Sequence, residues 1–352
     1  MSSATKDNFI ACRAVESDYP EVFRLWQLAF ASPYNVFEPQ DYVDNQLSRL
    51  YVFREIGGPL ASCAGYIEFE TTLAGQPVKC AGIAAVATPP SYRRLGLTRQ
   101  MFDLIMDDLD RRKITLACLW PFDYRFYEGL GFACTDTKLE VLANIDKLPR
   151  SHRAVNYKEI EPTFCKALSD LHQQWCMKHN LSFVRDEKRW GRMLARAGSE
   201  VMVLAHSHGY MLISLQEKEL VVSEWCYLSD QAFFDGLSLL AQFDSQFEKV
   251  RFSLRKDHYD LLLRSGLVSS YAEVSLKPGM MSRIAHLPSF ISLLERSGTT
   301  IDTELLVALG DHPGKSLQVA CGYYNKLPEE LSVLSPIKDL LADKVAFSVE
   351  RY

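Results

Sequence analysis

The pattern of hydrophobic and polar positions along the chain has two periods, one typical of strands and one typical of helices. In residues 1–150, stretches that alternate apolar and polar residues precede stretches in which apolar residues recur every three or four positions. The expected strands cover 51–54, 60–69, 78–87, 114–120 and 138–142. The expected helices cover 22–30, 97–112 and 124–130, with Asp18 placed to cap the first. Strands and helices in this order indicate a mixed α/β sheet.

The region 151–279 has a similar but less regular alternation of expected helices and strands. The expected helices cover 162–178, 186–197, 230–243 and 257–265. The expected strands cover 201–205, 210–216, 220–227 and 250–254. Lys277-Pro278-Gly279 then forms a turn typical of a boundary.

The last region, 280–352, is short. Its expected elements are a strand at 280–285, a helix at 287–296, strands at 304–309 and 316–320, and a helical turn at 337–342. A unit of this length makes a marginal core alone, so we expect it to pack on the other two. We therefore expect three domains with the boundaries 1–150, 151–279 and 280–352.

Composition narrows the class of protein. The chain has 352 residues, of which 47% are hydrophobic and 24% charged, as in an ordinary globular protein. Its net charge of -5 comes without a basic tract, which argues against nucleic acid as the main partner. No run of about 18 apolar residues predicts a membrane span, and the start lacks the pattern of a secretory signal. We expect a cytoplasmic protein without a membrane partner.

Metal and thiol chemistry are not expected from the sequence. The 9 cysteines include no Cys-x-x-Cys pair, and we expect reduced, mostly buried thiols. Cys118 and Cys134 flank the most informative segment, but no histidine precedes His152 to activate them. His206-Ser207-His208 lacks a third ligand and is expected to be a solvated turn.

The most informative segment follows the strand 78–87. Pro89-Pro90 ends the strand, because proline has no N–H to donate. A turn containing Gly96 then opens an amphipathic helix, whose first N–H groups are unpaired and carry the positive end of the helix dipole. Such a terminus, with arginines beside it, suits a pyrophosphate. By itself it is a weak signal, and a plain strand–loop–helix connection with a basic surface is the alternative.

The residues of this turn resemble the acetyl-CoA-binding motif of the GCN5-related N-acetyltransferase (GNAT) family, Arg/Gln-x-x-Gly-x-Gly/Ala. Here the motif is Arg93-Arg94-Leu95-Gly96-Leu97-Thr98, with threonine in the last small position. The resemblance implies that acetyl-CoA is the co-substrate and that no metal is needed. It assigns Val86, Ala87 and Thr88 to the pantetheine arm. It assigns the pyrophosphate to Arg93, Arg94, Leu95, Gly96, Leu97, Thr98 and Arg99.

A second segment of the sequence also resembles this family. Phe126-Tyr127-Glu128-Gly129-Leu130-Gly131-Phe132 resembles its Phe-Tyr-x-x-x-Gly-Phe segment. Tyr127 is expected to act as the general acid that protonates the departing coenzyme A thiolate. The alternative is an aromatic core residue with a satisfied hydroxyl, and Tyr124 is the nearest competitor for the acid. We also place Phe122 and Asp123 in the cofactor site.

The order of the regions is similar to that of the Eis-type (enhanced intracellular survival) acetyltransferases. These have two tandem GNAT-type mixed-sheet domains and a small sterol-carrier-protein-like α+β domain, which implies an α/β (α+β) fold here. The stretch 184–190 and Gly209-Tyr210 are similar to the second domain, and Met280–Ile284 to the first strand of the third. The second domain has no Arg-x-x-Gly loop and is expected to bind no cofactor. The resemblance also implies a homo-oligomer, a hexamer in this family.

The end of the chain resembles the Eis-type tail, whose carboxylate is the general base. The stretch 347–352 starts with Phe347 and ends on Tyr352. The resemblance therefore assigns the base to the α-carboxylate of Tyr352, against the alternative of a last strand that only packs its aromatic residue. The function expected is direct acetyl transfer to a primary amine of an aminoglycoside-like molecule, a polyamine or a lysine. The alternative is a non-catalytic protein that binds acetyl-CoA, a lipid or a partner on this scaffold.

Overall fold

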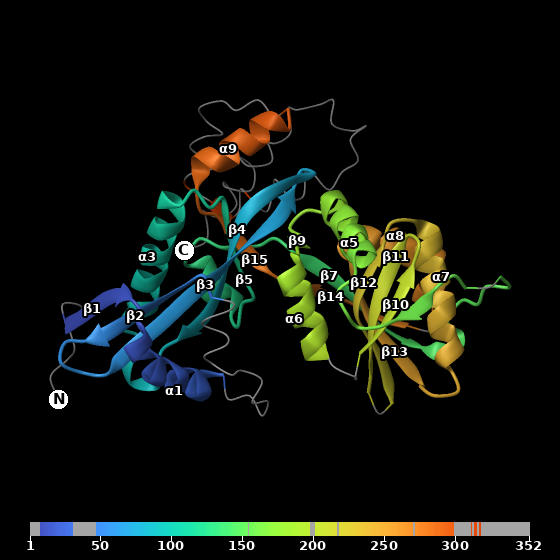
Figure 1. The fold of residues 1–352 in the computed structure, drawn as a ribbon, viewed down its shortest axis with the longest axis horizontal. Coiled ribbons are helices and arrows are strands. Elements are labelled where there is room, and N and C mark those ends of the chain that lie inside the picture. The colour runs from blue at the N-terminus through green and yellow to red at the C-terminus, as the bar shows by residue number, and fades with distance from the viewer. Residues whose placement is uncertain are drawn as a thin grey trace.

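The computed structural model describes residues 8–30, 47–153, 155–197, 201–216, 218–269 and 272–298, together with residues 311, 313, 314 and 317. Strands and helices form two mixed sheets, each with its own core, and Figure 1 shows the two side by side. The expected α/β fold with two tandem mixed-sheet units is confirmed. No helix in this described part of the chain is long and apolar enough to cross a bilayer.

The first sheet runs in the order β1-β2-β3-β4-β5-β15-β6, and β9 pairs with β3 outside this path. Its strands are β1 (Phe9–Arg13), β2 (Arg49–Glu55), β3 (Leu60–Leu73), β4 (Gln76–Ala87), β5 (Leu116–Leu119), β6 (Ala133–Cys134), β9 (Phe183–Val184) and β15 (Met281–Ile284). Neighbouring strands are antiparallel except β4 and β5, which are parallel. A parallel pair needs a crossover, and a helix supplies it here.

That crossover helix is α3 (Leu97–Arg111), which matches the expected range closely. It buries Leu97, Met101, Ile105 and Leu109, spaced four residues apart, against one face of the sheet. Each such side chain contributes about 1.5–3 kcal/mol on burial. The helix α9 (Leu287–Arg296) covers the opposite face of the sheet. Its buried side chains form a hydrophobic cluster with Cys80 and Leu116 of the sheet. Two shorter helices of this half are α1 (Tyr19–Ala29) and α4 (Tyr124–Glu128).

Asp18 lies at the start of α1 as expected, but its carboxylate does not cap this helix. Instead it accepts hydrogen bonds from the Val15 N–H, at 2.9 Å, and from Arg54, at 3.0 Å. The ion pair with Arg54 joins the start of α1 to β2.

The second sheet runs in the order β14-β7-β13-β12-β11-β10-β8. Its strands are β7 (Thr137–Asn144), β8 (Lys158–Ile160), β10 (Val201–His206), β11 (Gly209–Leu215), β12 (Glu219–Tyr227), β13 (Lys249–Arg255) and β14 (Ala272–Pro278). Its helices are α5 (Lys166–Lys178), α6 (Glu187–Ala197), α7 (Asp230–Leu240) and α8 (Tyr259–Arg264). β12 and β13 are its one parallel pair among the described strands, and α7 connects them.

Two strands lie in a different sheet from the one expected. The strand at 138–142, expected to close the first region, is β7 and pairs with β13 and β14. The strand at 280–285, expected to open the third region, is β15 and pairs with β5 and β6 of the first sheet. Apolar alternation shows which face of a strand is buried but not which neighbour it pairs with. The sterol-carrier-like domain is not shown. The elements expected at 304–309 and 337–342 lie outside the described residues, and residue 317 is the one described residue of 316–320.

The two sheets repeat one local arrangement. The pairing of β4 with β5 covers only Cys80–Gly82, and that of β12 with β13 covers only Glu219–Val222. In each parallel pair, the first strand contains a bulge after this short pairing. The register of β4 with β3 shifts at Ala85–Val86, and that of β12 with β11 shifts at Ser223. Such bulges bend a strand and end its pairing. Each sheet therefore opens between its two parallel strands.

Candidate active site

The opening in the first sheet is formed by the last residues of β4. Ala85 has a left-handed backbone conformation, with φ of 59°. Its carbonyl accepts a hydrogen bond from Trp26 Nε1 at 3.2 Å, and the Ala87 carbonyl accepts one from Ser62 Oγ at 3.2 Å. The bulge is thus held from the side of α1 and β3. Beyond Gly82 no pairing with β5 is found in the described residues, so this edge of β4 can accept an extended ligand chain.

The turn after β4 leads directly into α3. Arg94 and Gly96 both have left-handed conformations, with φ of 65° and 78°, and Gly96 is the N-cap residue. No side chain caps the helix there, so its first N–H groups are available to an anion. Arg93, Arg94 and Arg99 are all exposed around this turn. The sequence motif for a pyrophosphate site therefore has the expected local geometry.

Thr98, which replaces the family's last small residue, is tied into the turn. Its hydroxyl lies 3.2 Å from the Thr88 hydroxyl, which lies 2.8 Å from Ser62 Oγ. Arg93 Nε donates to the Thr88 carbonyl at 3.3 Å. Leu95 and Leu97 belong to the core under the turn. These contacts fix the end of β4 relative to the start of α3.

Tyr127 lies in α4 with its ring buried and 3% exposed. The ring packs against Phe102 of α3, Phe126 and Phe132, with centroids 5.0–6.3 Å away. Burial alone raises the pKa of Tyr127 to about 12. No hydrogen bond from its hydroxyl to another described residue is found, which leaves the hydroxyl available to a substrate.

The neighbours of Tyr127 have structural roles that the structure shows directly. Tyr124, the competing acid, donates a hydrogen bond to the Gly279 carbonyl at 2.7 Å. Asp123 is the N-cap of α4 and accepts from the Phe126 N–H at 3.1 Å. Phe122 is 77% exposed and packs on the rings of Phe126 and Tyr127. Phe122 is thus an exposed apolar surface at the mouth of the site, whereas Asp123 shapes the backbone.

Sequence reasoning missed two residues behind the site, namely Ser62 and Arg283. Arg283 Nη1 donates to the Leu130 carbonyl at 2.7 Å, and the guanidinium lies 5.8 Å from the Phe132 ring centroid. Arg283 comes from β15, far along the sequence, and nothing in the pattern linked it to α4. Ser62 could have been found only from the pairing of β3 with β4. Tyr352 lies outside the described residues.

The excluded thiol and metal candidates are placed as follows. Cys118 is buried, with its sulfur 3.7 Å from Cys80 Sγ, and Cys134 Sγ contacts the Asp136 carbonyl at 3.1 Å. The turn at His206-Ser207-His208 is solvated only in part, because His206 is buried and its Nε2 lies 3.5 Å from Asp235 Oδ2.

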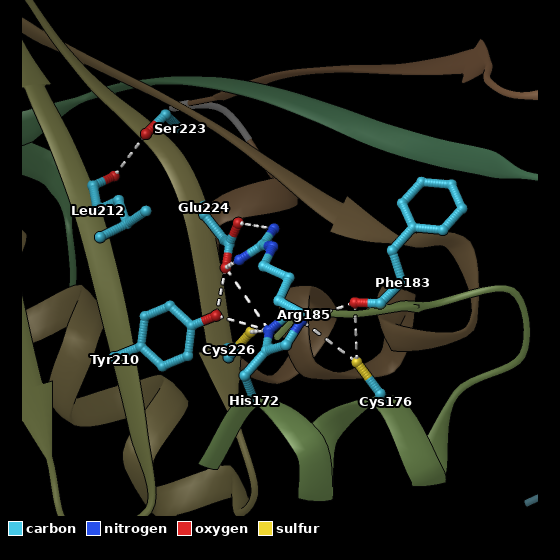
Figure 2. A network of polar contacts seen from close by, with 9 residues as sticks. All are labelled: His172, Cys176, Phe183, Arg185, Tyr210, Leu212, Ser223, Glu224 and Cys226. Atoms are coloured by element: carbon cyan, nitrogen blue, oxygen red, sulfur yellow. Dashed lines mark hydrogen bonds and ion pairs between the residues drawn. The ribbon is translucent and has the colours of Figure 1, made fainter. Parts of the chain in front are cut away.

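The second opening is built differently. The turn from β12 to α7 is short and has no arginine, and the N-cap Ser229 accepts from the Ala232 N–H at 3.2 Å. Asp230 adds a negative charge to the first turn of α7, which disfavours a phosphate there. Glu224 occupies the strand after the bulge, where it pairs with Arg185 through contacts of 2.7 and 2.6 Å (Figure 2). These features support the expectation that the second sheet binds no acetyl-CoA.

Figure 2 shows the rest of this polar network. Tyr210 donates to Glu224, and His172 contacts the Tyr210 hydroxyl at 2.7 Å and the Phe183 carbonyl at 2.9 Å. Although burial opposes it, the Arg185 ion pair lowers the pKa of Glu224. Burial, aided by Arg185, lowers the pKa of His172. The network therefore joins a histidine whose pKa is lowered to a compensated ion pair.

Residues 12–135 match the family model of the acetyltransferase (GNAT) domain. No curated protein matches the chain. A probable N-acyltransferase of unknown function from Enterococcus faecalis is 24% identical, with a TM-score of 0.69 over 80% of this chain and 74% of that chain.

Two further solved structures are similar. A GCN5-related N-acetyltransferase from Anabaena variabilis is 18% identical, with a TM-score of 0.70 over 79% of this chain and 73% of that one. Eis1 from Mycobacterium abscessus is 14% identical, with a TM-score of 0.66 over 80% and 75%. At these identities the likeness to Eis-type proteins is one of fold, and it does not show the third domain. The match of residues 12–135 to the acetyltransferase (GNAT) domain supports the expected enzyme class, an N-acetyltransferase.

Proposed function

We propose that the chain transfers an acetyl group from acetyl-CoA to a primary amine. One observation carries the proposal: the open edge of β4, the uncapped start of α3 and the hydroxyl of Tyr127 lie around one core. Val86 and Leu95 pack on the same cluster that buries Tyr127. A ligand chain along β4 and an anion at α3 would therefore lead toward this hydroxyl.

Acetyl-CoA, when bound, supplies the activated thioester. Val86, Ala87 and Thr88 would hold its pantetheine arm along the edge of β4. The turn from Arg93 to Arg99 would hold the pyrophosphate with its N–H groups and arginines. Backbone N–H near Val86 would polarise the thioester carbonyl, and Phe122 and Asp123 would flank the arm on its other side.

Tyr127 would act as the general acid. Its raised pKa keeps the phenol protonated at neutral pH, so the hydroxyl can donate a hydrogen bond to sulfur as negative charge develops there. A phenol with a pKa of about 12 is a weak acid toward an ordinary thiolate. The same apolar surroundings raise the proton affinity of a buried thiolate, which narrows this gap.

The remaining parts of the proposal rest on the resemblance to Eis-type enzymes. The α-carboxylate of Tyr352 would take the proton from the amine, and the acceptor would be an aminoglycoside-like molecule, a polyamine or a lysine. A net charge of -5 favours the approach of a cationic amine. We further propose a cytoplasmic homo-oligomer, a hexamer by this resemblance, without nucleic-acid or membrane partners.

The test is a thiol-release assay with acetyl-CoA and a panel of amines. Tyr127→Phe keeps the ring packing and removes the acid, so kcat should fall by about 10²–10⁴ while the melting temperature changes little. Tyr124→Phe is the matched control and should retain most of kcat. Binding of acetyl-CoA without turnover of any amine would favour the non-catalytic alternative. If acetyl-CoA does not raise the melting temperature, both readings are wrong.

A further inference from the structure

Two histidines and one aspartate come together in the second sheet unit. His179 follows α5 as its C-cap, and Asp257 and His258 lie in the turn between β13 and α8. One ligand atom of each residue lies within 4.8 Å of the other two. We propose that His179, Asp257 and His258 bind one divalent transition-metal ion of the class that prefers imidazole nitrogen, such as Zn²⁺, Co²⁺ or Ni²⁺.

The two imidazoles are held in place before any ion binds. Their ring centroids lie 4.9 Å apart, and Trp175 packs on both, at 4.1 Å from His179 and 5.5 Å from His258. His179 and His258 are only partly exposed, whereas Asp257 is exposed. This packing limits the motion of both rings, and the exposed carboxylate of Asp257 is the ligand that can turn most easily toward an ion.

A second contact orients His258. Its Nδ1 lies 2.5 Å from the hydroxyl of Tyr227, a buried residue of β12. Histidines that bind metals usually donate the hydrogen of their other ring nitrogen to a fixed partner, which sets the tautomer. In the tautomer in which Nδ1 donates to Tyr227, the Nε2 lone pair is left for an ion.

The charges around the cluster set its affinity for a cation. Arg255 pairs with Asp257 at 3.2 Å and reduces the attraction for a dication, so we expect moderate affinity. Its Nη1 also donates to the Asn180 carbonyl at 3.4 Å, an anchor that persists when Asp257 turns.

A cavity lies beside residues that contact the cluster. Trp175, Tyr227 and Arg255 line this cavity of about 260 Å³, and the three proposed ligands do not line it. Three protein ligands leave at least one coordination position of a tetrahedral ion for water or another ligand. The chain after His179 also binds β3, since Thr72 Oγ1 donates to the His179 carbonyl and the Leu181 N–H donates to the Thr72 carbonyl, both at 2.6 Å. An ion would therefore stabilise the junction of the two sheets.

A second cluster in the same half, formed by His172, Glu224 and Cys226, is not available to a metal ion. Both ring nitrogens of His172 already have partners, and Glu224 is engaged by Arg185 (Figure 2). Burial holds the pKa of the Cys226 thiol well above its usual value, so the thiolate that a metal requires is disfavoured.

The test uses the full chain without an affinity tag, stripped with a chelator and dialysed against Zn²⁺ or Co²⁺ alone. We expect one bound ion by elemental analysis, a visible Co²⁺ absorption band and a raised melting temperature. His258→Ala and Asp257→Asn should each lose the band and at least tenfold in affinity. Tyr227→Phe, which removes only the orienting contact, should weaken binding by about 10–100-fold.

His152→Ala, at an exposed histidine of the same half, is the control and should bind like the wild type. Absence of binding by the wild type would overturn the proposal. Equal binding by the wild type, His258→Ala and Asp257→Asn would assign the ion to scattered surface histidines and overturn it too. If His258→Ala does not fold, the exposed Asp257→Asn decides the question.

Discussion

The hydroxyl of Thr98, in the first turn of α3, lies 3.2 Å from that of Thr88 at the end of β4. Through Thr88 it is also linked to Ser62 of β3. A glycine or alanine, the usual residue of the GNAT motif at this place, could not make this contact. The threonine therefore adds a link that fixes the turn between strand and helix.

Loss of this link should loosen the turn. Thr98→Val keeps the shape of the side chain and removes one hydrogen bond, which costs about 0.5–1.5 kcal/mol of unfolding free energy. We expect the KM for acetyl-CoA to rise several-fold while kcat changes little. Urea unfolding and steady-state kinetics measure the two effects. Ser91→Ala, at an exposed serine of the same connection, is the control, and an equal rise of KM in both variants would argue against this role.

Gly96 should be required by its backbone conformation. Its φ of 78° costs a residue with a side chain about 1–2 kcal/mol, so Gly96→Ala should reduce stability by about that amount. Because the strain falls at the uncapped start of α3, the KM for acetyl-CoA should also rise by tenfold or more. Gly57→Ala is a matched control, since Gly57 has φ of 71° in a turn distant in sequence. It should lose similar stability and keep its KM, and an unchanged KM in Gly96→Ala would contradict the proposed pyrophosphate site.

Much of the first fold unit follows from the sequence pattern, and the pairing of its strands does not. α3 and α9 end within one residue of the expected bounds, because four-residue apolar spacing and flanking turns are local signals. β7 and β15 were placed in the wrong units, because a strand's neighbours depend on contacts far along the chain. Short strands such as β6 and β9 gave no detectable alternation.

The residues of the candidate site could likewise be predicted only in part from the sequence. The turn from Arg93 to Arg99 and Tyr127 were identified from contiguous motifs, and the structure gives them suitable geometry. Arg283 was not identified, because it acts through a hydrogen bond to a carbonyl far along the sequence. Asp123, which was assigned to the cofactor site, also caps α4, a local role that its position before a helix could have indicated.

The pH dependence of kcat should reflect the environment of Tyr127. A general acid is lost as the pH rises through its pKa, and burial has moved this pKa from about 10 to about 12. Ionisation of the phenol should therefore cause no fall of kcat between pH 8 and 10. The measurement is kcat at saturating substrates across this range, for the wild type and Tyr127→Phe. A fall with a midpoint near 10 that is absent from Tyr127→Phe would show that the hydroxyl is solvated and the assignment of its environment wrong.

The buried His172 should make the second unit sensitive to acid. Burial and Arg185 lower its pKa in the folded state, whereas the unfolded chain binds a proton near the ordinary value of about 6.5. The unfolded state thus holds more protons below this pH, and the free energy of unfolding falls as the pH drops from 7 toward 5. Other buried histidines also make the free energy of unfolding fall as the pH drops. The test therefore compares the pH dependence of variants with that of the wild type. In urea unfolding, His172→Gln should lose less stability over this range than the wild type, whereas the exposed His152→Gln should follow the wild type. Parallel curves for all three proteins would mean that His172 is protonated to the same extent in the folded and unfolded states.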